Sequence, residues 1–463
     1  DSSESRGLGD VYKRQPFLIL LKFGLSMIDR EKFQPGYFKS TWPVECGGNR
    51  RQKSSKGRLN AENAVAEVQT VSSDKWNVMV IKRDAGEFYL GGTMPYFFGP
   101  EPYGWVQKFD SITLETLSES AKLPCGGHVW CGAIAAHENG NIIKVNGNYM
   151  HSLDRNCGVV KETKLPIDRA HNGLLVLSDG TIVTKDCRLE GQGKSSITRL
   201  DPNTLETLDA PLSLPEGSMG RIASDLSSDG EFIFVPGIEK IWKIRVSEEG
   251  LEVEDDWAPR YRESNGNQGL AWDGCISDDY IWIMDNGDID SVRSIYGVHP
   301  NGRFKEYQSL SWRSPAPWKG KQRLIRISLA TGELNFIEPF AKGGGGIIAP
   351  PVNIPEFNMC VAWDSINGGI AGISYSEEEL EVSWKIDLRA TMQPVVFPES
   401  RELVINHYEK GRDQIVVLDI LSGEILSQVD VNSSLANGMF LTPGNNRDIF
   451  YCSTGAFSRI SWS

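Results

Sequence analysis

Two histidines and one arginine stand just before apolar, strand-forming segments, and their side chains could carry chemistry. His128, His171 and Arg221 are separated from one another by 43 and 50 residues. A neutral imidazole can act as a general base or metal ligand, and a guanidinium can hold an anion through two parallel hydrogen bonds. Such distant residues act together only if the fold brings the starts of successive segments to one place.

Amide and aromatic side chains extend this candidate set. Gln268 and Gln393 precede later apolar segments in the same way, so we expect both to bind substrate. The loop at residues 91–105 is rich in rings, which would form an aromatic lip and bind a flat or apolar group. Its candidate binding residues are Tyr96, Phe97 and Trp105. The structural alternative is that polar channel residues are satisfied by water and that the rings pack their own loop.

The elements that must position these residues repeat along the chain. A strand, a polar turn and a second strand recur in four clear copies: FDSITLETL from Phe109, LDPNTLETL from Leu200, ISLATGEL from Ile327 and LDILSGEIL from Leu418. The first two copies are 91 residues apart, as are the last two, and weaker copies fall at the halfway points. Half of this interval is close to the roughly 40–50 residues of one four-stranded propeller blade.

A second series of hairpins lies between the first: Gly173–Asp186, Ala223–Val235, Leu270–Asp285 and Phe440–Cys452. Two hairpins in each repeat predict an all-β chain that forms a single β-propeller. The spacing favours eight blades, with seven as the alternative. The last blade lacks an outer strand, and unpaired sheet edges invite aggregation, so we expect a strand within Ala61–Val71 to close the ring.

The predicted propeller covers residues 61–463, with a proline-containing insertion at 286–322 that would serve as a lid or a partner-binding arm. We expect residues 1–60 to form an N-terminal extension that is partly disordered. Residues 9–15 resemble a translated sequencing adaptor, and the basic run between Arg50 and Arg58 is interpreted as a solvated tail.

Composition excludes several classes of protein. The net charge is −13 and no basic stripe is present, so a nucleic-acid partner is not expected. The apolar stretch at residues 16–27 is short and contains Lys22, so we predict no membrane span. Eight cysteines without a CxxC pair argue against a metal finger. The sequon at Asn432 favours a secreted or extracytoplasmic location, although the compartment stays open.

Two short motifs carry a resemblance to a known group of propellers. SGEIL at residues 422–426 and TGEL at residues 331–334 resemble the repeats of the quinoprotein-like eight-bladed propellers. The resemblance implies the fold across most of the chain. The sequence lacks the adjacent cysteine pair found in many quinone-dependent alcohol dehydrogenases, which argues against a bound quinone.

A further likeness concerns calcium. The segments HNGLLVLSDGTIVTKD from His171 and ANGMFLTPGNNRDIFYC from Ala436 are similar to units of the calcium-dependent lactonase propellers. That resemblance implies Asn172 and Asn437 as metal ligands, and calcium does prefer oxygen donors. The acidic run at residues 285–290 misses the spacing of known calcium loops and is interpreted as a solvated turn.

These observations predict an enzyme of hydrolase or transferase type, working at the mouth of a central channel on an anionic or carbonyl-bearing small molecule. His128, His171 and Arg221 would be its catalytic residues. One alternative is a calcium-dependent, lactonase-like hydrolase. Another is a non-catalytic scaffold that binds a protein partner through the insertion.

Overall fold

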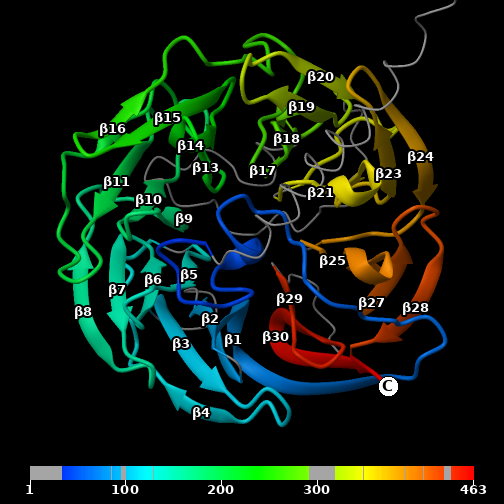
Figure 1. Cartoon of the computed structure of the whole chain (residues 1–463), viewed down its shortest axis with the longest axis horizontal. Coiled ribbons are helices and arrows are strands. Elements are labelled where there is room, and N and C mark those ends of the chain that lie inside the picture. The colour runs from blue at the N-terminus through cyan, green and yellow to red at the C-terminus, as the bar shows by residue number, and fades with distance from the viewer. Residues whose placement is uncertain are drawn as a thin grey trace, which may run out of the picture. The chain divides into compact units, whose positions relative to one another are not determined.

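A computed structural model describes residues 34–84, 86–94, 101–128, 130–290, 319–347, 349–391, 393–409, 411–431 and 440–463. Residues Pro35–Ser463 form one compact unit. Strands dominate its described part, and the named helical elements there are short 3₁₀ turns: η2 (Glu45–Gly47), η4 (Pro355–Phe357) and η5 (Pro398–Ser400). The prediction of an all-β propeller is confirmed by sheets that surround a common centre (Figure 1).

Six four-stranded sheets follow one another along the chain, and in each the strands pair in sequence order. The first three are β5–β8 (Ala133–Ala136, Ile142–Asn146, Tyr149–Leu153, Val159–Lys164), β9–β12 (His171–Val176, Ile182–Asp186, Ser196–Leu200, Leu212–Ser213) and β13–β16 (Ala223–Ser227, Gly230–Pro236, Ile241–Ser247, Gly250–Val253). The next three are β17–β20 (Gly274–Ser277, Tyr280–Met284, Leu324–Ser328, Leu334–Ile337), β21–β24 (Val352–Ile354, Met359–Trp363, Ile370–Tyr375, Leu380–Ile386) and β25–β28 (Val395–Phe397, Glu402–Glu409, Arg412–Asp419, Ile425–Asp430). Both predicted series of hairpins are therefore present.

A seventh sheet has six strands and joins the two ends of the ring. Its strands are β1 (Ala66–Asp84), β2 (Glu87–Met94), β3 (Tyr103–Phe109), β4 (Thr116–Glu119), β29 (Leu441–Pro443) and β30 (Asp448–Trp462). The first part of β1, Ala66 to Ser72, pairs antiparallel with β30. This is the segment in which a closing strand was expected.

The outer hairpins owe their turns to an aspartate at the end of the first strand. Asp110 Oδ1 accepts hydrogen bonds from the backbone N–H groups of Ile112 and Thr113, both at 2.8 Å. Asp201 and Asp419 hold the turns of their own hairpins in the same way. A short carboxylate that accepts backbone N–H groups two and three residues ahead stabilises a tight turn. The recurring Asp is thus a local folding signal.

Neighbouring sheets are locked together by side chains that cross between them. Trp384 on β24 packs over Gly423 in the β27–β28 turn, and its indole N–H donates to Ile420 O at 2.9 Å. Gly423 has φ +71, and a Cβ there would lie 2.5 Å from the Trp384 ring. Glycine at this turn therefore serves both the backbone conformation and the packing of the next sheet.

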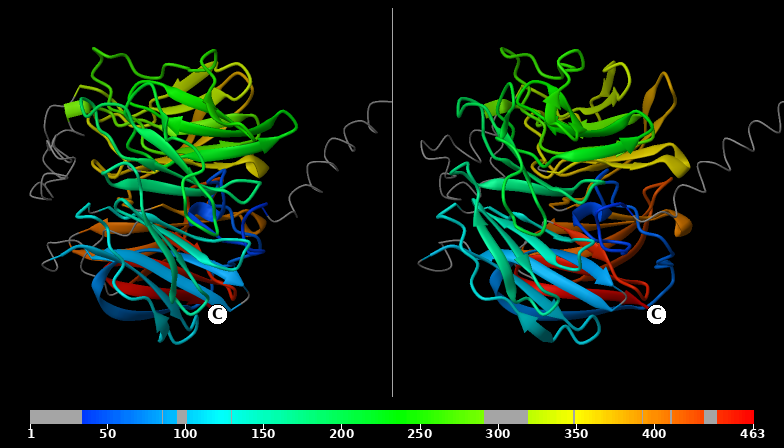
Figure 2. Two further views of the ribbon diagram at one scale, coloured as in Figure 1. Left: turned by 90° about the vertical axis from the view of Figure 1, so that its left-hand side faces the viewer. Right: turned by 60° about the vertical axis from the view of Figure 1, so that its left-hand side comes forward.

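Residues 36–55, here called the central segment, pass through the middle of the ring (the dark blue trace in Figures 1 and 2). Three isolated bridges tie the segment to inner strands or the residues that follow them: Tyr37↔His137, Val44↔Ala135 and Ser54↔Val396. Backbone hydrogen bonds reach three further sheets: Lys82 N to Trp42 O, Ser224 N to Asn49 O and Ile276 N to Arg50 O. Backbone groups of the inner strands that face the centre thereby find partners.

The interpretation of the basic run as a solvated tail is wrong for two of its members. Arg51 and Lys53 are only 2% and 1% exposed. Arg51 pairs with Glu45 of the same segment and with the distant Asp273. Lys53 donates to the distant carbonyl groups of Pro350 and Pro351. Local sequence does not reveal these distant partners. The compact unit accordingly begins at Pro35 rather than at the expected boundary of residue 61.

The stem of the insertion is also more buried than expected. Asp285 pairs with Arg323 at 2.7 Å, and Asp288 Oδ2 accepts the backbone N–H groups of Lys319 and Gly320. The acidic run is therefore not a solvated turn, because two of its carboxylates fasten the stem. Residues 291–318 lie outside the described residues, so the lid or partner-binding role of the insertion stays a prediction.

Among the described residues, no helix has the length and apolar character needed to cross a bilayer.

Candidate functional site

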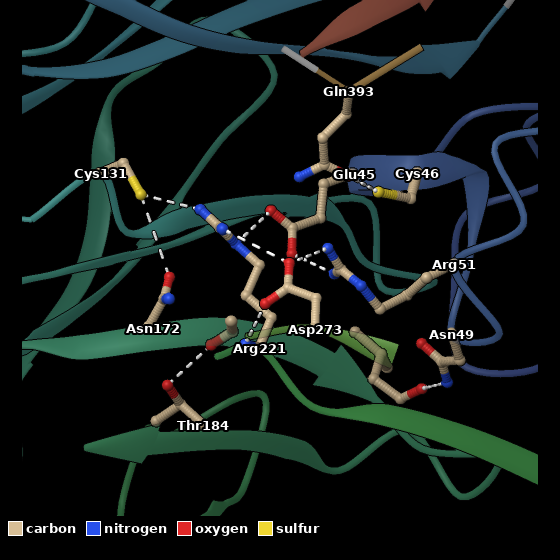
Figure 3. A network of polar contacts seen from close by, with 12 residues as sticks. Glu45, Cys46, Asn49, Arg51, Cys131, Asn172, Thr184, Arg221, Asp273 and Gln393 are labelled. Carbon is tan, nitrogen blue, oxygen red and sulfur yellow. Dashed lines mark hydrogen bonds and ion pairs between the residues drawn. The ribbon is translucent and has the colours of Figure 1, made fainter. Parts of the chain in front are cut away.

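Arg221 lies just before β13 and points into a buried polar network at the centre of the ring (Figure 3). Its Nε is 2.9 Å from Glu45 Oε2, and its Nη1 is 3.8 Å from Asp273 Oδ2. Nη2 also donates to the Cys131 thiol at 2.8 Å, and the backbone N–H donates to Asp273 Oδ1 at 2.7 Å. The guanidinium expected to hold a substrate is already paired with two carboxylates.

Arg51 of the central segment completes this network. It donates to Glu45 and, at 3.0 Å, to Asp273 Oδ2. Burial by itself would lower the pKa of Arg221, but the Cys131 thiol and the Glu45 and Asp273 carboxylates raise it above its ordinary value. Two guanidinium groups and two carboxylates therefore neutralise one another. This arrangement is typical of a buried structural ion-pair network.

Several predicted residues surround this network. Asn172 Nδ2 donates to Met219 O at 3.2 Å, and Gln393 Oε1 accepts from the Cys46 thiol at 2.9 Å. Trp130 and Trp272 stack close by, with ring centroids 6.4 Å apart, and the Arg221 guanidinium lies over the Phe440 ring. The central segment, the charged network and these aromatic side chains together occupy the middle of the propeller.

The structure describes only one of the two predicted metal ligands, Asn172. Asn437 lies outside the described residues, and the amide oxygen of Asn172 faces the Cys131 thiol at 3.9 Å. In the described part of the chain, no three His, Cys, Asp or Glu side chains converge to hold a metal ion. The role of Asn172 and Asn437 as calcium ligands, which the resemblance implied, therefore stays a prediction.

His171, at the start of β9, is fully buried and has one unoccupied ring nitrogen. Its Nδ1 lies 2.9 Å from Arg169 O, and a carbonyl can only accept, so Nδ1 carries the proton. Nε2 is buried without a hydrogen-bond partner. Burial lowers the pKa of His171 to about 4, against the opposing charge of Asp186. At neutral pH the imidazole is thus neutral, with a bare lone pair on Nε2.

Arg169, two residues earlier, is the charged group that the sequence reasoning missed. Its Nη1 is buried without a hydrogen-bond partner, and in the described residues its guanidinium has no ion pair. Burial and the nearby Arg188 lower the pKa of Arg169, while Arg188 is itself paired with Asp186 at 2.7 Å. The only signal in the sequence was the closeness of Arg169 to His171.

His128 lies in the loop before β5 and contacts the residue preceding Arg169. Its Nε2 is 3.2 Å from Asp168 Oδ1, and Asn148 donates to the same oxygen at 2.6 Å. The hydrogen bond from His128 lowers the pKa of Asp168, which is largely exposed. The loop segments of the β5–β8 and β9–β12 sheets therefore bring His128, Asp168 and Arg169 into one region.

The other predicted binding residues are dispersed. Gln268 Nε2 donates to Lys321 O at 2.9 Å and so belongs to the stem of the insertion. Trp105 is 1% exposed and lies under the Lys75 ammonium, so it does not form an exposed lip. Tyr96 and Phe97 lie outside the described residues. The predicted cluster thus divides into a closed central network and a region around Arg169 and His171.

Comparison with known proteins supports the fold and goes no further. No protein-family model matches the chain, and no curated protein matches its sequence. The quinohemoprotein alcohol dehydrogenase from Comamonas testosteroni superposes with a TM-score of 0.60 at 9% identity, covering 91% of this chain and 80% of that chain. A europium-containing methanol dehydrogenase gives 0.59 at 11% identity, covering 92% and 98%. The Dos1 propeller gives 0.52 at 9% identity, covering 87% and 97%.

The chain is therefore a β-propeller. The distant likeness to quinoprotein-like propellers is confirmed as a likeness of fold. A planar redox cofactor at the centre of this ring would have to displace the central segment and the Trp130–Trp272 stack. The residues present do not fit such a group there.

Proposed function

We propose that the chain binds a small anionic molecule beside Arg169 and His171 and acts on it as an enzyme of hydrolase or transferase type. One observation supports this above all. The partly buried guanidinium of Arg169 has no ion pair among the described residues. Two residues further along the chain, the fully buried imidazole of His171 has a bare Nε2. Buried polar groups without partners cost about 1–3 kcal/mol each, so a ligand that satisfied both would gain binding energy.

The two side chains would divide the work. Arg169 supplies positive charge that Arg188 cannot, because Arg188 already faces Asp186 at 2.7 Å. His171 Nε2 would accept a hydrogen bond from a ligand hydroxyl or N–H group. With a pKa of about 4, the free imidazole is a weak base, and a bound anion would raise that value by favouring the imidazolium. Anion binding should then be accompanied by proton uptake at His171.

His128 is assigned a supporting position. Its contact with Asp168 fixes the loop next to Arg169. Arg221 was expected to hold the anion, but its pairing with Glu45 and Asp273 favours Arg169 for that role. The roles of His128 and His171 as catalytic residues remain predictions until a substrate is known.

The proposal is tested by titrating sulfate, phosphate and acetate into the protein by calorimetry at pH 5.5 and 7.5. Arg169→Gln should lower the affinity for the tightest-binding of these anions by about 10–100-fold, since hydrogen bonds to charged groups contribute about 1.5–3 kcal/mol. Arg245→Gln is the matched control, because Arg245 on β15 pairs with Glu254, which follows β16, and is far from Arg169 in sequence. His171→Gln should abolish the proton uptake. Equal anion affinity in Arg169→Gln and Arg245→Gln would refute the site.

Turnover is tested separately with esters of the anion that binds best. The double variant His128→Gln and His171→Gln should lose activity while its melting temperature stays close to that of the wild type. General acid–base assistance is worth about 10²–10⁴-fold in rate. Full activity in the double variant would exclude catalysis by these histidines and leave a binding protein.

We also infer that the ring has eight blades. The six-stranded sheet divides at the irregularity between Ser72 and Trp76, where β1 changes its partner from β30 to β2. β30 itself folds back at Gly455, and Arg459 meets Asp448 at 2.7 Å across the two halves. β29, the two halves of β30 and the first part of β1 then make one four-stranded blade. The closing strand would come from the N-terminal side of the propeller.

A further inference from the structure

The antiparallel pairing of β9 with β10 sets two arginines opposite each other. The two strands pair as far as the end of β10. The pairing continues one step further, because the backbone N–H of Cys187 donates to Ala170 O at 2.8 Å. The next residues on the two chains are Arg169 and Arg188. Directly opposite residues of an antiparallel pair have Cβ atoms about 4.5–5.5 Å apart, and like charges in that position repel each other.

Arg188 is held in place, yet part of its guanidinium stays available. Its Nε donates to Asp186 Oδ2 at 2.7 Å, and its Nη1 donates to Gln192 O at 3.2 Å. Among the described residues, Nη2 has no hydrogen-bond partner. The side chain is 19% exposed, so a ligand can reach it from solvent. Asp186 cancels the charge of Arg188, but Nη2 still offers N–H donors that two fixed partners orient.

Arg169 faces this group with a guanidinium that is also incompletely paired. Its side chain is partly exposed, and Nη1 has no hydrogen-bond partner. The neighbouring carboxylate of Asp168 is largely exposed and contacts His128 instead. Burial and the charge of Arg188 lower the pKa of Arg169, and Asp186 opposes them. Two guanidinium groups thus face each other with one carboxylate, and an anion bound between them would relieve their repulsion.

We propose that Arg169 and Arg188 together bind a tetrahedral oxyanion, the phosphate or sulfate group of a small molecule, and that Arg188 determines this specificity. The inference rests on the proposed function and narrows its anion to one chemical class. A tetrahedral group carries at least three oxygen atoms, which two guanidinium groups can share. A carboxylate has only two oxygens in one plane, and a single guanidinium can engage both. Arg188 therefore strengthens the binding of the tetrahedral group much more than that of a carboxylate.

The test compares phosphate, sulfate and acetate by calorimetry at pH 7.5 in the wild type and in the paired variant Asp186→Asn with Arg188→Gln. This variant removes both charges together, so the net charge is unchanged and no buried carboxylate loses its partner. The amide that replaces Asp186 can still accept the backbone N–H of Ser196. The variant should lower the affinity for phosphate and sulfate by at least about 10-fold and that for acetate by less than about threefold. The tighter of phosphate and sulfate in the wild type identifies the group.

Two further variants accompany the paired one. Asp448→Asn with Arg459→Gln is the matched control, since Arg459 Nε also lies 2.7 Å from Asp448 Oδ2, with side chains 15% and 2% exposed. It should leave all three affinities unchanged. Arg188→Lys keeps a positive charge beside Asp186 and so protects the fold. Because lysine lacks the planar fork of arginine, this variant should still lower phosphate and sulfate affinity by at least about threefold.

The outcomes separate this inference from the proposed function. If Arg169→Gln weakens anion binding but the paired variant and Arg188→Lys bind phosphate and sulfate as the wild type does, Arg169 acts alone and the role of Arg188 is wrong. An equal loss of acetate and phosphate affinity in the paired variant would overturn the preference for a tetrahedral group. If Arg169→Gln also binds all three anions normally, the proposed function and this inference both fail.

Discussion

The central segment offers the sharpest test of how this ring is held together, through the change Arg51→Ala. Arg51 is 2% exposed and donates to both Glu45 and Asp273. Its removal leaves two buried carboxylates facing Arg221 alone. Breaking a buried ion pair by deleting one partner typically costs about 3–5 kcal/mol, because an uncompensated charge remains inside.

That loss is large beside the total stability of a protein, which is usually about 5–15 kcal/mol. Unfolding entropy is roughly 2 cal/mol/K per residue, so in a unit of this size the loss lowers the melting temperature by about 3–6 °C. Arg58→Ala is the matched control on the same stretch of chain. Arg58 is 65% exposed and its Nε lies 4.0 Å from Glu399, so this pair contributes about 0–1 kcal/mol.

The assay is urea unfolding followed by tryptophan fluorescence, with calorimetric melting as a second measure. The double variant Glu45→Gln with Arg51→Met should be more stable than Arg51→Ala, because Asp273 and Arg221 then remain as a balanced pair. If Arg51→Ala and Arg58→Ala lose equal stability, the central segment is not an energetic part of the ring and the reasoning fails.

Other predictions concern single residues and the ends of the ring. Burial raises the pKa of Asp413 to about 6, so its contribution to stability is complete below about pH 4 and is lost as pH rises through 6. The free energy of unfolding of Asp413→Asn, relative to that of the wild type, should therefore increase by about 1 kcal/mol from pH 5 to pH 7.5. A difference that does not change with pH would contradict this. Gly423→Ala should cost at least about 1 kcal/mol more than Gly411→Ala in urea unfolding, because both have positive φ but only the first Cβ meets the Trp384 ring. Deleting residues 34–72 should prevent soluble folding, and a monodisperse, cooperatively melting truncation would show that the pairing of β1 with β30 is dispensable.

Local signals predicted the repeating part of the fold well. The turn aspartates Asp110, Asp201 and Asp419 act within three residues of themselves, so their pattern survives in the sequence without any tertiary information. The same holds for the alternating strands, whose periods depend only on side-chain direction along the chain.

The candidate site could be predicted only in part. Residue type indicated His171 as a catalytic residue, and its unoccupied Nε2 is compatible with that prediction. Arg221 was chosen for its place before a strand, but whether a guanidinium is free depends on which carboxylates the fold brings to it. Arg169 was overlooked for the same reason, because nothing in the neighbouring residues shows that it lacks a partner.

The sequence by itself determined the hairpins, their spacing and the all-β propeller, since these follow from interactions between residues close together in the chain. Only the tertiary structure decided what fills the centre. Glu45 and Arg51 are neighbours in one segment, but Asp273 and Arg221 lie far from them in sequence, so all four charges meet only after the ring has formed. The energy of a buried charge depends on its surroundings in space, and for that reason the closed network and the unpaired groups beside it were not evident from the sequence.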